Sequence, residues 1–166
     1  MIETVLLYLA VIIIVTAVIL IGIGADEIRR QNEDGSDADF KRSENLLIAA
    51  AIVDGIAGFI VLWIAMRSSR DPSLLREIYF QKGSVRGIIF LVFIALVVGG
   101  GLAWFAAEEM KKSKNFGKAE RTAFARAHSG ALISWTASAF ILIAFAFTYA
   151  HPKREELEEK VAAGTE

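Results

Sequence analysis

The chain has 166 residues, of which 55 % are apolar, a formal net charge of −1 and no cysteine. The length fits one domain, and the lack of cysteine excludes disulfides, thiolate metal sites and thiol nucleophiles. No basic face or basic segment dominates, so nucleic acid is not an expected partner.

The apolar residues fall into four blocks, residues 2–23, 46–66, 87–107 and 130–150. Each block matches the ~20 residues that a helix needs to cross a bilayer. Glu3 stands where a signal peptide would carry a basic residue, so we expect the first block to be retained as a span. The sequence therefore predicts an all-α, polytopic membrane protein in which residues 1–150 form a bundle of four transmembrane helices.

The polar segments between these blocks carry helix signals of their own. Residues 25–30 are expected to continue the first helix, and Ser43 is a candidate N-cap of the second. Asp71 followed by Pro72 is typical of a helix start, which predicts a short interfacial helix over residues 72–82. His151-Pro152 is expected to end the fourth span, and residues 151–166 are expected to form a charged, solvent-exposed tail with a short helix.

Glycines inside the spans indicate close helix packing. Small residues let helix backbones approach each other in a membrane. We expect this role for Gly55 and Gly58 in the second span and for the run Gly99, Gly100 and Gly101 in the third. A hinge or pore wall is the alternative for the three consecutive glycines.

A shift of 82 residues lays the first span on the third and the second on the fourth. Residues 25–30 then align with residues 107–112, and Asp54 falls on Thr136. Duplication of a helical hairpin and chance similarity both remain open. A duplication would produce two parallel repeats related by an axis along the membrane normal.

Asp54, near the middle of its span, is the residue that the sequence singles out. A charge at this depth is costly, so such residues face the protein interior and often serve a function. Thr16, Thr136 and Ser138 lie at a similar depth and are expected to form an intramembrane polar layer with it. No Lys, Arg or His shares the layer, which predicts a neutral carboxyl. A hydrogen bond between helices, a contact with a partner subunit and transport of a proton or ion remain alternatives.

Two families share features with the chain. The stretch Ile52-Val53-Asp54-Gly55 in an Ala-rich helix, preceded by the polar loop residues 30–33, resembles the rotor-ring proteolipid of ATP synthases. That resemblance implies that Asp54 carries a proton and that the loop contacts a rotor stalk. Residues 2–23 lack the glycine ridge of that family, and Thr136 leaves the second hairpin without an acid. The four-span layout also resembles MARVEL-type tetraspans, in architecture only.

No motif predicts a catalytic residue, a cofactor or a metal site. His128 and His151 bracket the fourth span, ~34 Å apart along a helix, and therefore cannot share one iron. The pairs Asp26/Glu27 and Glu108/Glu109 are expected to be solvated helix ends, with a metal site between them as the alternative.

The sequence thus predicts a non-enzymatic accessory or scaffold subunit of a larger membrane assembly. Its expected partners are the lipid bilayer and other membrane subunits or further copies of itself. The alternative is a proton- or cation-translocating component that uses Asp54. Both termini are expected on one side of the membrane, and Glu3, Arg29 and Arg30 favour the non-cytoplasmic side.

Overall fold

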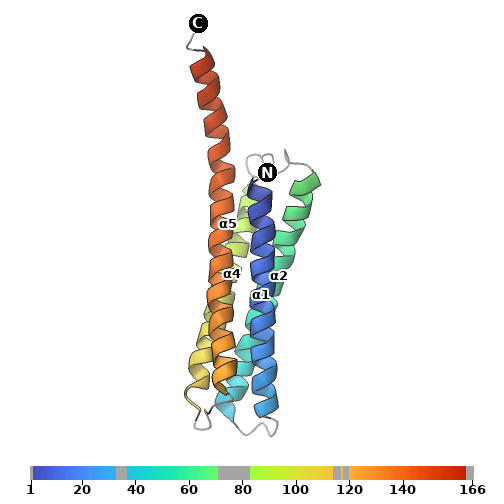
Figure 1. The fold of residues 1–166 in the computed structure, drawn as a ribbon, viewed down its shortest axis with the longest axis vertical. Coiled ribbons are helices and arrows are strands. Elements are labelled where there is room, and N and C mark those ends of the chain that lie inside the picture. The colour runs from blue at the N-terminus through green and yellow to red at the C-terminus, as the bar shows by residue number, and fades with distance from the viewer. Residues whose placement is uncertain (1, 33–36, 71–82, 114–116, 118–119, 164–166) are drawn as a thin grey trace.

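The described part of the chain forms an antiparallel bundle of four helices (Figure 1). The computed structural model describes the backbone of residues 2–32, 37–70, 83–113, 117 and 120–163, and the side chains of residues 4–32, 37–70, 87–113, 117 and 120–146. The helices are α1 (Ile2–Gln31), α2 (Ala38–Arg70), α4 (Gly83–Met110) and α5 (Glu120–Ala163). The predicted interfacial helix over residues 72–82 lies outside the described residues.

All four helices are long and apolar enough to cross a membrane. In lipid, a helix satisfies its own backbone hydrogen bonds, so the Val- and Ile-rich sequence of α1 is compatible with a helix. Many side chains that point outward from the spans are large and apolar, for example Ile12 (62 % exposed), Phe59 (72 %) and Phe105 (66 %). The all-α class and the four span-length helices predicted from the sequence are confirmed, and α1 begins at the same end of the bundle at which α5 ends (Figure 1).

The helices pack in a ring. Helix α1 contacts α2 and α5, and α4 contacts the same two helices. Helices α1 and α4 are therefore diagonal to each other, and so are α2 and α5. Two clusters of buried apolar side chains fill the interior, one toward the termini and one toward the two short loops. Asp54, Gly99 and Ser134 occupy the layer between the two clusters.

Burial follows the same pattern in both halves of the chain, with one difference in register. Most buried positions of α1 and α4 coincide at the predicted offset of 82 residues, whereas most of those of α2 and α5 coincide at an offset of 80. The counterpart of buried Asp54 is thus buried Ser134, and not Thr136, which is exposed. Matching pairs include Ile14 with Leu96, Ile21 with Ala103, Ile28 with Met110, Leu47 with Ala127, Ala57 with Ala137, and Val61 with Ile141.

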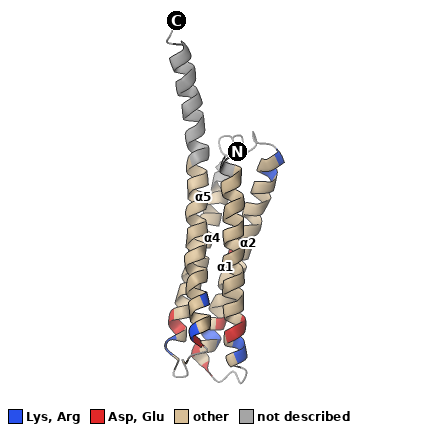
Figure 2. Ribbon diagram, viewed as in Figure 1, with Lys and Arg blue, Asp and Glu red and all other residues tan. Residues whose placement is uncertain are grey.

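The helices extend beyond their apolar blocks at the loop end of the bundle, where acidic and basic residues gather (Figure 2). Residues 25–30 continue α1, as predicted. Helix α2 begins at Ala38, and its cap is Asp37, whose Oδ1 accepts hydrogen bonds from the amides of Asp39 (3.0 Å) and Phe40 (3.2 Å). The assignment of Ser43 as the cap was wrong, because Ser43 lies inside α2 and donates to the Asp39 carbonyl (2.9 Å).

The C-terminal helix is longer than its apolar block. Helix α5 continues past residue 150 through Pro152 to Ala163. The expected end of the helix at His151-Pro152 was therefore wrong, although Pro152 has no amide hydrogen to donate within the helix. The helical state of most of the tail agrees with the sequence. Its expected exposure to solvent stays a prediction, because the side chains beyond residue 146 lie outside the description.

Candidate functional site

The most distinctive polar contact lies at the centre of the bundle. Asp54 on α2 is completely buried, and its Oδ2 accepts a hydrogen bond of 2.8 Å from Ser134 Oγ on α5. The same hydroxyl lies 3.2 Å from the carbonyl oxygen of Leu96 on α4. Since α2 and α5 are diagonal, this contact crosses the bundle and joins three helices at one depth.

Gly99 on α4 provides the space for the Asp54 carboxyl. A Cβ at this position would lie 2.7 Å from Asp54 Cγ and closer still to Oδ1. No side chain could therefore stand there without displacing the carboxyl. Oδ1 is buried and has no hydrogen-bond partner among the described residues. The backbone of α4 thus closes the site on the Oδ1 side.

The contact is compatible with a neutral carboxyl. A protonated Asp54 can donate to Ser134 Oγ, and the hydroxyl hydrogen of Ser134 can then be donated to the Leu96 carbonyl, which lies within reach. A charged carboxylate would instead lack a cation, because no Lys, Arg or His among the described residues bonds to it. Since burying an unpaired charge in a membrane span is costly, the neutral form fits this geometry.

The other residues of the predicted polar layer do not reach Asp54. Thr16 and Thr136 are exposed and donate to the carbonyls of Ile12 (2.9 Å) and Leu132 (2.8 Å) on their own helices. Ser138 is buried but donates to the carbonyl of Trp135 (2.7 Å). Depth along a span does not determine which way a side chain points around the helix.

Ser134 was missed for the same reason. Sequence spacing could have identified it, because it shares a helical face with small residues three or four positions apart. Ala127, Ala131 and Ser138 belong to that face, and all are buried. Ser134, a polar residue on a face of α5 that is rich in small residues, was therefore a stronger candidate partner for Asp54 than Thr136.

The glycines predicted to support helix packing divide into two groups. A Cβ at Gly58 would lie 2.9 Å from Ile14 Cγ2, and one at Gly100 would lie 2.6 Å from Trp135 Cδ1, so both permit a close approach, as Gly99 does. The indole NH of Trp135 donates to the Val97 carbonyl (3.2 Å). A Cβ added at Gly55 or Gly101 would meet no atom within 4 Å among the described residues, so both positions face open space.

Gly130 is a packing glycine that the sequence analysis did not single out. A Cβ at this position would lie 2.5 Å from Ile21 Cγ1 on α1. It does not stand out in the sequence because it lies at the margin of the predicted fourth span, without a second glycine nearby.

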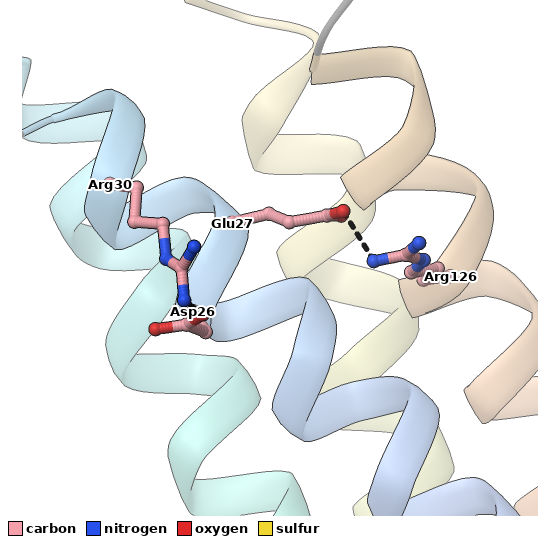
Figure 3. Close-up of polar contacts among 4 residues, drawn as sticks. All are labelled: Asp26, Glu27, Arg30 and Arg126. Atoms are coloured by element: carbon pink, nitrogen blue, oxygen red, sulfur yellow. Dashed lines mark hydrogen bonds and ion pairs between the residues drawn. The ribbon is translucent and has the colours of Figure 1, made fainter.

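The four carboxylates of the two predicted acidic pairs each form an ion pair with a cation rather than with one another. Glu27 on α1 forms an ion pair with Arg126 on α5, while its neighbour Asp26 turns to Arg30 on α1 (2.7 Å; Figure 3). Glu108 and Glu109 pair with Lys111 (3.0 Å) and Lys112 (2.6 Å). Across the described residues, no group of three or more His, Asp or Glu side chains is placed to hold a metal ion.

His128 lies among aromatic side chains near this end of the bundle. Its ring stacks on Trp104, with 3.9 Å between centroids, and contacts Phe124 at 4.5 Å. Its Nε2 is 3.5 Å from Glu108 Oε1, which is too long for a hydrogen bond of ordinary strength. The surroundings are those of a packed side chain at the edge of the apolar region.

Comparison with known proteins finds no matching family model, no similar curated protein and no similar solved structure. Neither the rotor-ring proteolipid resemblance nor the tetraspan resemblance is therefore supported by a family match.

Proposed function

We propose that the chain is a non-enzymatic membrane protein that serves as an accessory or scaffold subunit of a larger membrane assembly. Its four span-length helices and its apolar outer surface support placement in a bilayer. Lipids, other membrane subunits or further copies of the chain would contact that surface. Both termini would lie on one side of the membrane.

The enclosed carboxyl of Asp54 is the observation that favours a structural role. A transported cation needs a site with several oxygen ligands and a route to water. At Asp54, the Gly99 backbone closes one side of the carboxyl, and Ser134 occupies the other. A buried polar group that is held in this way fixes the register of neighbouring helices. The Asp54–Ser134 hydrogen bond would then fix the helices of the bundle relative to one another.

Proton translocation is the second candidate function, and one observation favours it. Asp54 Oδ1 is a buried carboxyl oxygen without a hydrogen-bond partner among the described residues. Intramembrane carboxyls occur in proton relays, and an oxygen without a partner among these residues leaves this carboxyl able to bond a second proton donor or acceptor. The two functions differ in one measurable respect, because a relay requires a proton that exchanges at Asp54, whereas a structural contact tolerates an amide at the same place.

Purification from native membranes in mild detergent tests the accessory role. We expect the chain to co-migrate with the same membrane proteins, in constant stoichiometry, through affinity and size-exclusion steps. The Asp54→Asn variant should retain these partners, since an amide NH₂ can donate to Ser134 Oγ as a neutral carboxyl does. Recovery of the native chain only as an isolated monomer would contradict the accessory role.

We also propose that the two helical hairpins are parallel repeats. The buried positions support this, because α1 matches α4 at an offset of 82 and α2 matches α5 at an offset of 80. The ring order of the helices is the order that a twofold axis along the bundle would produce. Under this axis Asp54 and Ser134 are equivalent residues that meet at the centre, and Ala17 is the counterpart of Gly99.

A further inference from the structure

A groove lies on α2 at the end of the bundle that carries the termini. The described residues that line it are Trp63, Met66, Arg67 and Arg70, and its volume is about 360 Å³. Their spacing of three, four and seven residues places them on one face of the helix. The face changes along its length from an apolar half, Trp63 and Met66, to a basic half, Arg67 and Arg70.

The wall that carries the groove is fixed against α1. Ser69 and Tyr8 are joined by a hydrogen bond of 3.0 Å, and Ser68 and Thr4 by one of 2.8 Å. These bonds hold the last turn of α2 in place. The side chains of the groove therefore project from a supported helix end.

The two arginines can bind an anion. The guanidinium carbon of Arg67 lies 5.2 Å from the centroid of the Trp63 ring, which orients the group by a cation–π contact. Within the described ranges, no carboxylate forms an ion pair with Arg67 or Arg70. A guanidinium presents N–H donors in a planar fork that matches the oxygens of a phosphate.

The apolar half of the groove lies toward the bilayer side of the arginines. Trp63 is 46 % exposed and Met66 is 47 % exposed, and both belong to the second apolar block. An apolar wall that continues directly into a pair of cations matches an acyl chain joined to a phosphate. A soluble anion would use only the basic half.

We propose that this groove binds an anionic phospholipid, with the phosphate between Arg67 and Arg70 and an acyl chain along Met66 and Trp63. Basic side chains at the end of a transmembrane helix attract anionic headgroups, at about five-fold in affinity for each Lys or Arg. Two arginines should therefore produce a preference of roughly 25-fold for an anionic over a zwitterionic lipid.

Native mass spectrometry of the full chain tests this proposal. The protein is equilibrated in detergent with equal amounts of phosphatidylglycerol and phosphatidylcholine, and the lipids retained on it are counted. The double variant Arg67→Gln/Arg70→Gln should reduce the preference to about two-fold or less. The matched control is Arg29→Gln/Arg121→Gln, which removes the same charge from exposed positions at the loop end and should lower the preference clearly less than the groove variant does.

Three outcomes would overturn the proposal. One is an equal retention of both lipids by the native chain. Another is an equal loss of preference in the control, since the effect would then reflect net charge rather than this groove. The third is an unchanged preference in the Arg67→Gln/Arg70→Gln variant. The groove would then not bind the lipid, and an acidic protein segment would be its candidate partner.

Discussion

Ser134 Oγ and Asp54 Oδ2 are joined by a hydrogen bond of 2.8 Å across the diagonal of the bundle. Their helices, α5 and α2, are not neighbours in the ring of packed helices. The bond therefore links two diagonal helices, which otherwise meet only through the apolar clusters of the bundle interior. It lies between the two apolar clusters, at the point where a rotation of either helix would break it.

Two substitutions of Asp54 should distinguish the contribution of its hydrogen bond to stability from that of its ionisable group. Asp54→Asn keeps a donor for Ser134 Oγ, so we expect the free energy of unfolding to change by about 1 kcal/mol or less. Asp54→Ala removes the bond and leaves a cavity beside Gly99, and should destabilise the bundle by roughly 2–3 kcal/mol. Reversible unfolding in mixed micelles measures both changes. Equal effects of Asn and Ala would show that the bond contributes nothing.

The three consecutive glycines of α4 provide a matched series. Gly99→Ala and Gly100→Ala should each destabilise the bundle by roughly 1–3 kcal/mol, because the new methyl groups overlap with Asp54 and Trp135. Gly101→Ala meets open space and should be neutral or stabilising by up to about 1 kcal/mol. The same unfolding assay ranks them, and a cost at Gly101 equal to that at Gly99 would contradict the observed packing.

Coupling between Asp54 and Gly99 should be detectable by a double-mutant cycle. If Gly99→Ala lowers the free energy of unfolding because its methyl group overlaps with the Asp54 carboxyl, then the same substitution should cost much less in the Asp54→Ala background. We expect the loss of stability in the double variant to be smaller than the sum of the losses in the two single variants, by about 1 kcal/mol or more. Gly100→Ala combined with Asp54→Ala is the control, because Gly100 faces Trp135, and its effects should be additive.

An exchange of equivalent residues tests the proposed repeat. The double substitution Asp54→Ser/Ser134→Asp exchanges the two equivalent residues. Under the proposed twofold axis, the new carboxyl at position 134 would then face Ala17, as the native carboxyl of Asp54 faces Gly99. We expect this exchange to fold poorly and to gain stability when Ala17→Gly is added, by about 1–3 kcal/mol. Adding Ala17→Gly to the native chain should bring no such gain. Absence of rescue would count against the symmetry of the two hairpins.

The two ion pairs at the end of α1 should differ in their contribution to stability. Asp26 and Arg30 have exposed side chains on one helix, and breaking that pair with Asp26→Asn should cost about 0.5 kcal/mol or less. The Glu27–Arg126 pair joins two helices and is about one-third exposed on each side. Glu27→Gln should therefore cost more, roughly 1–2 kcal/mol. An equal cost for the two variants would show that the interhelical pair does not help to fix α5 against α1.

Hydropathy predicted the spans because a bilayer imposes one length and one composition on any helix that crosses it. It could not predict rotation about the helix axis. Asp54 was identified by its charge and depth, whereas Ser134 was overlooked in favour of Thr136, which points outward. The same limit explains why the three glycines of residues 99–101 were grouped together, although a Cβ at Gly101 would meet no atom within 4 Å among the described residues.

Helix boundaries beyond the apolar blocks depend on local capping rather than on hydropathy. Asp37 caps α2 well before its apolar block begins, and its Oδ2 also accepts a hydrogen bond of 2.6 Å from Ser113 near the end of α4. A contact between residues so distant in the chain is not visible in a single sequence. Ser43 had the right chemistry for a cap, but it lies on a buried face of the helix.

Proton flux into proteoliposomes is the most direct test of whether the Asp54 carboxyl is a structural contact rather than a relay. The native chain and Asp54→Asn are reconstituted at equal density, and a pH-sensitive dye reports flux under an imposed pH gradient and membrane potential. A structural contact predicts that both proteins match protein-free liposomes, with both correctly folded by their unfolding curves. Flux through the native chain that Asp54→Asn abolishes would contradict the structural role and establish translocation in its place.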